Sequence, residues 1–147
     1  MSELKDRIRK EMTAAMKARD KERTNTLRML VSEIGNEETK GSKHELTDQD
    51  VLAVVAREIK KRKESAEIYE QNGRPELAEN ELAEAKVISE FQPTQLSDDE
   101  LASLVAEVVK DNPSMGPAMK AAKEKAAGRV DGKRLSEAVR AELAKLA

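Results

Sequence analysis

Apolar residues recur along the chain at the three- and four-residue spacing of amphipathic helices, in seven separate stretches. Leu27, Leu30 and Ile34 are one example, because their spacing places them on a single stripe of a helix. No stretch shows the alternation of apolar and polar residues that is typical of a half-buried strand. The pattern therefore predicts an all-α fold.

Local signals predict where these helices begin and end. Thr47 can cap the third helix through its hydroxyl, and Ser97 with Glu100 forms a capping box at the start of the fifth. Gly128 is placed to serve as the C-cap of the sixth helix. The capping signals agree with the apolar stripes, so the sequence predicts seven helices.

A proline divides the predicted helices into two groups. Pro93 cannot continue a helix and restricts the residue before it, which makes residues 92–95 the best candidate linker. We predict an N-terminal four-helix domain over residues 1–92 and a C-terminal three-helix domain over residues 96–147. The second domain is near the lower size limit for an independent core.

The composition excludes several classes of protein. There are no cysteines, so no disulfide framework, thiolate metal site or cysteine nucleophile is available. The charged N-terminal residues do not form a signal peptide, and no apolar run approaches the length of a membrane span, roughly 20 residues. These features predict a cytoplasmic protein that does not enter a membrane.

No self-contained catalytic site is visible in the sequence. It lacks a phosphate-binding Walker A loop, a dinucleotide fingerprint, a His-Glu-x-x-His pair and a Gly-x-Ser-x-Gly elbow. The single histidine, His44, lies in a predicted loop and is interpreted as an exposed surface residue. We expect no catalytic residue, no metal site and no cofactor.

The formal net charge of −2 conceals an uneven distribution. Residues 1–50 carry 11 basic and 11 acidic side chains, residues 51–110 carry 8 and 13, and residues 111–147 carry 8 and 5. A basic run at 60–63 has glutamates three and four positions away, which can pair with its cations on a helix. We interpret that run as a solvated helix face.

A second basic cluster is less neutralised and surrounds a predicted helix–glycine–helix junction. Two acidic residues, Glu124 and Asp131, accompany six cations: Lys120, Lys123, Lys125, Arg129, Lys133 and Arg134. The cations and the N–H groups at the start of the last helix could bind one run of phosphates. An ordinary glycine-capped turn with surface lysines is the competing interpretation. The near absence of aromatic residues favours backbone contact with a structured RNA over base stacking.

Six ordered segments stand out beyond the helix pattern. They are TLRMLV at 26–31, EIKKRKES at 58–65, NGRPELA at 72–78, FQPTQL at 91–96, MGPAM at 115–119 and GRVDG at 128–132. Together they resemble the GatB/YqeY family, and in particular its stand-alone YqeY-like proteins. The likeness covers essentially the whole chain and is specific because the segments keep their order and spacing.

The resemblance implies a two-domain helical fold similar to the tail of the B subunit of tRNA-dependent amidotransferase. In that enzyme the tail contributes tRNA binding, and the chemistry takes place in other domains. The family is also associated with glutamine-dependent carbon–nitrogen ligase activity. This sequence shows neither a serine–lysine nucleophile system nor an ATP and metal site for such a reaction.

Taken together, the cluster and the resemblance favour a non-catalytic tRNA-binding accessory module, with tRNA as partner and no role for DNA. Two alternatives stay open at this point. One is a protein-interaction helical bundle that binds no RNA, and the other is a subunit that contributes to an amidotransferase. Kinship at the level of the fold does not choose among them.

Overall fold

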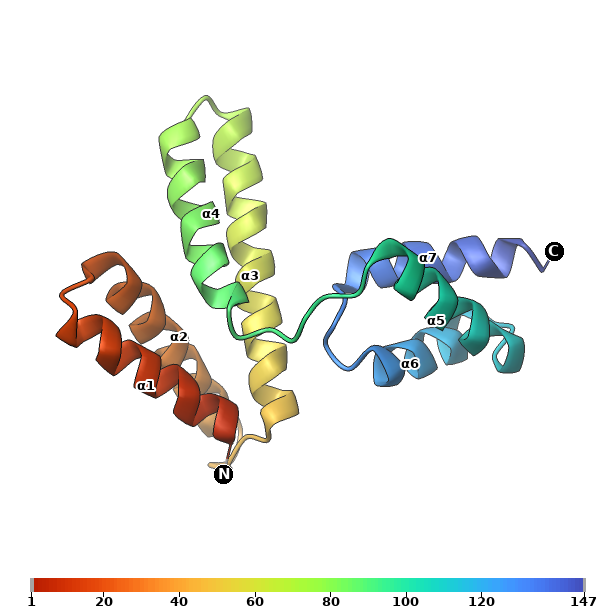
Figure 1. Cartoon of the computed structure of the whole chain (residues 1–147), viewed down its shortest axis with the longest axis horizontal. Helices are drawn as coiled ribbons and strands as arrows, with labels where there is room; N and C mark the ends of the chain where they lie inside the picture. The colour runs from red at the N-terminus through yellow and green to blue at the C-terminus, as the bar shows by residue number, and fades with distance from the viewer. Residues whose placement is uncertain (1, 147) are drawn as a thin grey trace. The chain divides into compact units, whose positions relative to one another are not determined.

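The computed structural model describes residues 2–146, and all regular secondary structure in that range is α-helical (Figure 1). This confirms the predicted fold class and the number of helices. In chain order the helices are α1 (Glu3–Lys17), α2 (Lys21–Thr39), α3 (Asp48–Gln71), α4 (Pro75–Ser89), α5 (Asp98–Asp111), α6 (Met115–Ala126) and α7 (Gly132–Ala144). None of the helices in the described part of the chain is long and apolar enough to span a bilayer.

The chain divides into two compact units, Met1–Gln92 with α1 to α4 and Pro93–Ala147 with α5 to α7. The sequence predicts domains over residues 1–92 and 96–147, whose terminal residues 1 and 147 lie outside the described part. Whether each unit folds without the other stays a prediction.

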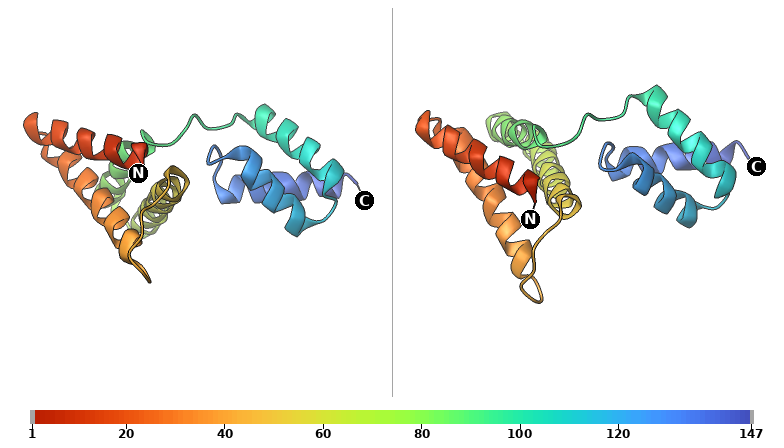
Figure 2. Two further views of the ribbon diagram at one scale, coloured as in Figure 1. Left: turned by 90° about the horizontal axis from the view of Figure 1, so that it is seen from below. Right: turned by 60° about the horizontal axis from the view of Figure 1, so that its bottom comes forward.

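The first unit consists of two helical hairpins. The helices α1 and α2 form one hairpin and α3 and α4 form the other, as Figures 1 and 2 show. Their apolar stripes meet in one core, whose largest fully buried side chains include Ile8, Leu27, Leu30, Ile34 and Ile88. The hairpin turns leave the core and expose the polar residues between the helices.

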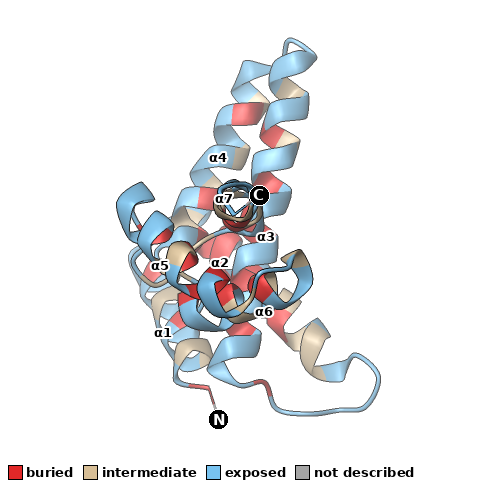
Figure 3. Ribbon diagram, turned by 90° about the vertical axis from the view of Figure 1, so that its right-hand side faces the viewer, coloured by how far each residue is buried: buried red, intermediate tan, exposed pale blue. Residues whose placement is uncertain are grey.

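The second unit is a three-helix bundle. Its buried residues, coloured red in Figure 3, are Leu96 before α5 and residues on α5, α6 and α7. Val105, Leu135 and Val139 are at most 1% exposed, and α6 contributes the small residues Ala118 and Ala122. Alanines on α6 allow the other two helices to approach it closely, so the bundle buries its core with few large side chains.

The helix termini follow the capping signals with one shift. The Thr47 hydroxyl cap and the capping box of Ser97 with Glu100 form as the sequence predicts, and Asp50 acts as a reciprocal partner that makes the Thr47 cap a second capping box. The end of α6 lies one residue earlier than predicted, because Ala127 takes the C-cap position in the left-handed conformation with φ of 48°. Gly128 follows with φ of 81°, so the turn into α7 uses two consecutive left-handed residues.

Candidate nucleic-acid interface

The structure places the six predicted RNA-binding residues around one helix–turn–helix junction. Lys120, Lys123 and Lys125 lie on α6, Arg129 lies in the turn, and Lys133 and Arg134 lie in the first turn of α7. The N-cap of α7 is Asp131, whose carboxylate accepts a hydrogen bond from the Arg134 N–H at 2.8 Å. The cations are therefore close along the chain, but they divide into two groups by their contacts.

An extended strap, residues 94–96, lies against this junction. The Leu96 N–H donates to the Arg129 carbonyl oxygen at 2.8 Å, and the Gln95 amide donates to the Gly128 carbonyl oxygen at 3.3 Å. Two backbone carbonyls of the α6–α7 turn are thus satisfied by residues more than 30 positions earlier in the chain. The strap fixes the entry of the chain into α5.

Both arginines of the cluster fasten the strap. The Arg129 Nε donates to the Thr94 carbonyl oxygen at 2.8 Å. One terminal nitrogen of Arg134 donates to the Leu96 carbonyl oxygen at 3.1 Å and to Asp98 Oδ1 at 2.9 Å. Their side chains are 39% and 34% exposed. The arginines hence have a structural role whether or not RNA binds.

The capping box of α5 belongs to the same polar network. The Ser97 N–H and hydroxyl hydrogen-bond the Glu100 carboxylate and N–H at 3.0 and 3.1 Å, and Glu100 Oε2 lies 4.0 Å from Arg129. The hydrogen bonds with Ser97 lower the pKa of Glu100, and the Arg129 charge adds to the shift. A lowered pKa stabilises the folded state above the ordinary carboxyl pKa, and this stability is lost as the pH falls through the folded pKa.

Replacing Ser97 with alanine should lower the free energy of unfolding of the second unit by about 1 kcal/mol, because it leaves an N–H of the first turn without its acceptor. The same change should raise the pKa of Glu100 toward its ordinary value. Urea denaturation at neutral pH measures the first effect, and carboxyl titration by NMR measures the second. Ser103, exposed in the middle of α5, is the matched control for the serine-to-alanine change.

Three lysines of the cluster differ from the arginines. Lys120, Lys123 and Lys133 are exposed and make no ion pair with any described residue. Lys125 is intermediate in this respect, because its Nζ lies 3.2 Å from Glu107 Oε2 on α5. The cations that remain available for an external anion are therefore mainly the three unpaired lysines.

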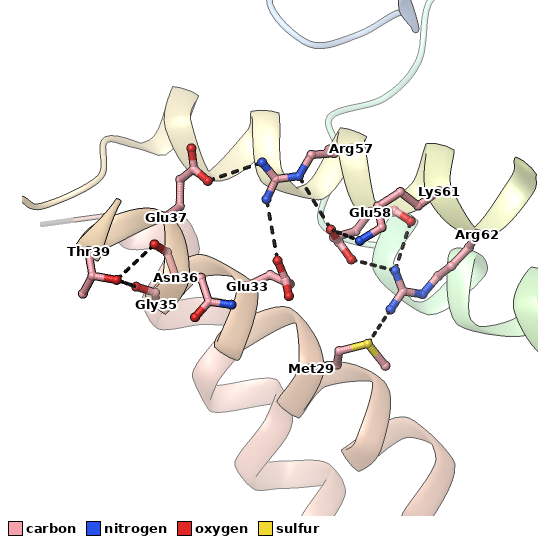
Figure 4. A network of polar contacts seen from close by, with 10 residues as sticks. All are labelled: Met29, Glu33, Gly35, Asn36, Glu37, Thr39, Arg57, Glu58, Lys61 and Arg62. Carbon is pink, nitrogen blue, oxygen red and sulfur yellow. Dashed lines mark hydrogen bonds and ion pairs between the residues drawn. The ribbon is translucent and has the colours of Figure 1, made fainter. Parts of the chain in front are cut away.

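The first unit contains a buried ion pair that the sequence analysis missed. Arg62 and Glu58 lie one turn apart on α3, with side chains 7% and 2% exposed (Figure 4). Arg62 donates to Glu58 Oε1 at 2.9 Å and to Met29 Sδ on α2 at 3.0 Å. Its Nε makes no hydrogen bond within the described residues, and it lies at an ion-pair distance of 3.4 Å from Glu84 Oε2 on α4. One guanidinium thus links three helices.

Further cations complete the surroundings of the Glu58 carboxylate. Lys61 Nζ lies 3.5 Å and Arg57 Nε 3.7 Å from Glu58 Oε2. Arg57 also reaches Glu33 and Glu37 on α2, at 3.8 and 3.3 Å (Figure 4). The basic run at 60–63 is therefore only partly a solvated face, because it includes the buried Arg62.

A sequence signal for this pair exists. Glu58 and Arg62 continue the apolar stripe of Val51, Val55 and Ala66 at three- and four-residue spacing. A charged pair four residues apart on a buried stripe indicates mutual neutralisation in the core. The sequence analysis treated all four residues at 60–63 as one exposed cluster and therefore did not identify this ion pair.

Comparison with known proteins decides the family. A family model described as YqeY-like protein matches residues 5–143. The chain belongs to the YqeY-like family. This confirms the resemblance inferred from the six sequence segments.

Several curated proteins are similar to this YqeY-like chain. An uncharacterized protein of Schizosaccharomyces pombe is 39% identical over 90 residues, which is 61% of this chain and 72% of the relative. Altered inheritance of mitochondria protein 41 of Kluyveromyces lactis is 27% identical over 130 residues, 87% of this chain and 69% of the relative. The protein of the same name from Lachancea thermotolerans is 30% identical over 114 residues, 74% of this chain and 61% of the relative.

The relatives correct the predicted cytoplasmic location. Both proteins named Altered inheritance of mitochondria protein 41 are also called mitochondrial, which points to mitochondria rather than to the cytoplasm. The prediction depended on the lack of cysteines and on the charged N-terminal residues. Neither feature separates the cytoplasm from the mitochondrial interior.

Proposed function

We propose that this YqeY-like protein is a non-catalytic tRNA-binding accessory module. Phosphates of the RNA contact the exposed lysines of the α6–α7 junction. The observation that carries the proposal is that Lys120, Lys123 and Lys133 are exposed and have no ion-pair partner among the described residues. By contrast, Lys60 and Lys61 of the other basic run lie 4.0 and 3.5 Å from glutamate oxygens.

The aromatic residues support backbone contact rather than base stacking. Phe91 is 2% exposed. The Arg7 guanidinium lies over its ring, with the guanidinium carbon 5.2 Å from the ring centroid. Tyr69 is the other aromatic residue of the chain, and it is half-buried on α3. Without an exposed aromatic platform, binding depends on cations that contact phosphates of a folded RNA.

The strap positions these cations. Arg129 and Arg134 fix the α6–α7 turn to residues 94–96, so the two helices that carry the lysines are joined by a constrained turn and not by a free loop. A constrained arrangement loses less conformational entropy when an RNA binds. In this proposal the arginines therefore act as positioning residues.

A triple variant tests the proposal. The combined variant carries Lys120→Gln, Lys123→Gln and Lys133→Gln. It should make the negative slope of log affinity against log salt shallower by about 2 to 3, at roughly 0.7 to 0.9 per phosphate contact. The measurement is fluorescence anisotropy of labelled total tRNA across a salt series. The matched control replaces three exposed lysines elsewhere that make no ion pair within the described residues: Lys40→Gln, Lys43→Gln and Lys63→Gln.

The result also decides the competing function. Wild-type protein that does not bind tRNA at low salt would contradict the proposal and favour a protein-interaction bundle. An open groove of about 360 Å³ between α5 and α7 gives that alternative a location, with Leu101, Ala138 and Ala141 among its lining residues. A junction variant that keeps the wild-type slope would exclude the lysines as the contact site.

A further inference from the structure

The α1–α2 hairpin carries a second concentration of positive charge. Residues 9–28 contain three acidic side chains, Glu11, Asp20 and Glu22. The same residues contain seven basic ones: Arg9, Lys10, Lys17, Arg19, Lys21, Arg23 and Arg28. The excess is hidden when charge is averaged over residues 1–50, because the rest of that range is acidic.

The contacts of these cations leave most of them unpaired. Arg23 is neutralised, because it lies 3.2 Å from Glu11 and 2.7 Å from Glu90. The other six cations are exposed, and none forms an ion pair with a described residue. Asp20 is itself engaged as the N-cap of α2, where it accepts the Arg23 N–H at 3.1 Å. More cations are unpaired here than at the α6–α7 junction.

The six cations lie on the two helices of one hairpin and in the turn between them, and this turn is seen at the left in Figure 2. Lys10 and Lys17 lie two turns apart on the outward stripe of α1, and Lys21 and Arg28 have the same spacing on α2. Seven residues of helix span about 10 Å. Arg19 lies in the turn with φ of 60°, a conformation that Asp20 and the α1 terminus hold through backbone hydrogen bonds.

We infer that the α1–α2 turn is a second phosphate-binding surface, which contacts the backbone of the same structured RNA. The choice of RNA as the anion rests on the proposed function. The surface itself rests on six exposed cations, none paired with a described residue, that lie within one helical hairpin. A polyanion is the partner whose charge complements this surface.

An anionic membrane is the other polyanionic surface that could attract these cations. A helix that lies in a membrane interface needs an apolar face directed toward the lipid. The apolar face of α1 is occupied, because Ile8 and Ala15 are buried in the core of the first unit. The exposed large apolar side chains of the hairpin are Met16 and Met29, at 49% and 42%, and Met29 is also in contact with Arg62 of α3. Two methionines do not provide an insertion face, so the observations favour RNA.

The full chain carries the test. Lys17→Gln, Lys21→Gln and Arg28→Gln together should reduce the salt slope of tRNA binding by about 2 to 3, since three phosphate contacts contribute roughly 0.7 to 0.9 each. Arg19 is left unchanged because its positive φ makes substitution a conformational perturbation. The control is the variant with Lys40, Lys43 and Lys63 replaced, and far-ultraviolet circular dichroism verifies that helicity is retained.

The junction variant measured beside the hairpin variant separates the two proposals. A weaker salt dependence of tRNA binding in both variants supports two surfaces on one RNA. A weaker salt dependence in the junction variant alone overturns the hairpin surface and keeps the proposed function. A weaker salt dependence in the hairpin variant alone supports the hairpin surface and excludes the junction lysines as a contact site. Wild type that binds vesicles of phosphatidylserine and phosphatidylcholine but no tRNA overturns both in favour of a membrane, and binding to neither overturns both outright.

Discussion

Replacing Glu58 with glutamine is expected to lower the free energy of unfolding of the first unit by about 3 kcal/mol. The change removes the carboxylate that neutralises a guanidinium only 7% exposed, and breaking a buried pair from one side typically costs about 3 to 5 kcal/mol. The value lies at the lower end because glutamine retains an acceptor oxygen for Arg62. Urea denaturation followed by circular dichroism at 222 nm measures the loss.

Two further variants make this result interpretable. Glu64→Gln is the matched control, because its side chain is 60% exposed and its partner Lys60 lies 4.0 Å away; a change within about 0.5 kcal/mol is expected. The double variant Glu58→Leu with Arg62→Met should recover most of the stability, since it removes both buried charges at once. A Glu58→Gln protein as stable as wild type would show that the Glu58–Arg62 pair is not buried in solution.

Leu135→Ala is expected to unfold the second unit under conditions in which the first stays folded. Leu135 is 1% exposed in the three-helix core, and removing a buried leucine costs about 2 to 5 kcal/mol. A unit of this size has a total stability of roughly 3 to 8 kcal/mol at about 0.05 to 0.15 kcal/mol per residue. The loss is therefore comparable with the whole stability of the unit, whereas the first unit loses nothing.

A urea titration of the Leu135→Ala protein should show two separate transitions, with the first assigned to residues 93–146 by amide NMR signals. Leu146→Ala is the matched control, because Leu146 is 59% exposed and its truncation removes little buried area. A single transition in the Leu135→Ala protein, in which both units unfold together, would contradict the independence of the second unit.

The features that the sequence predicts well are those set by neighbouring residues. The Thr47 hydroxyl cap and the Ser97 capping box depend on residues three positions apart, and both form. The end of α6 differs from its predicted position by one residue, and this difference also depends on neighbouring residues. Ala127 adopts the left-handed cap conformation one residue before Gly128, because the turn uses both positions. The all-α class follows from the same short-range spacing.

The features that the sequence did not reveal depend on residues far apart in the chain. Arg62 meets Met29, 33 positions earlier, and Arg129 meets Thr94, 35 positions earlier. No short-range pattern places a guanidinium against a particular distant carbonyl or sulfur. For this reason the sequence analysis put Arg129 and the lysines of the junction into one class, whereas the structure separates strap-holding arginines from unpaired lysines.

The strap also has a consequence for the order of events on the ribosome. The first unit is complete once residue 92 has emerged, because all its helices and core residues precede that point. The start of α5 is different, since Arg134 and the carbonyl of Arg129 hold it from the far end of the unit. A nascent chain that has released α5 and α6 alone lacks these fastenings and also lacks Leu135 and Val139. Synthesis therefore leaves the basic α6–α7 junction unformed until α7 has left the exit tunnel, after the whole of the first unit has emerged.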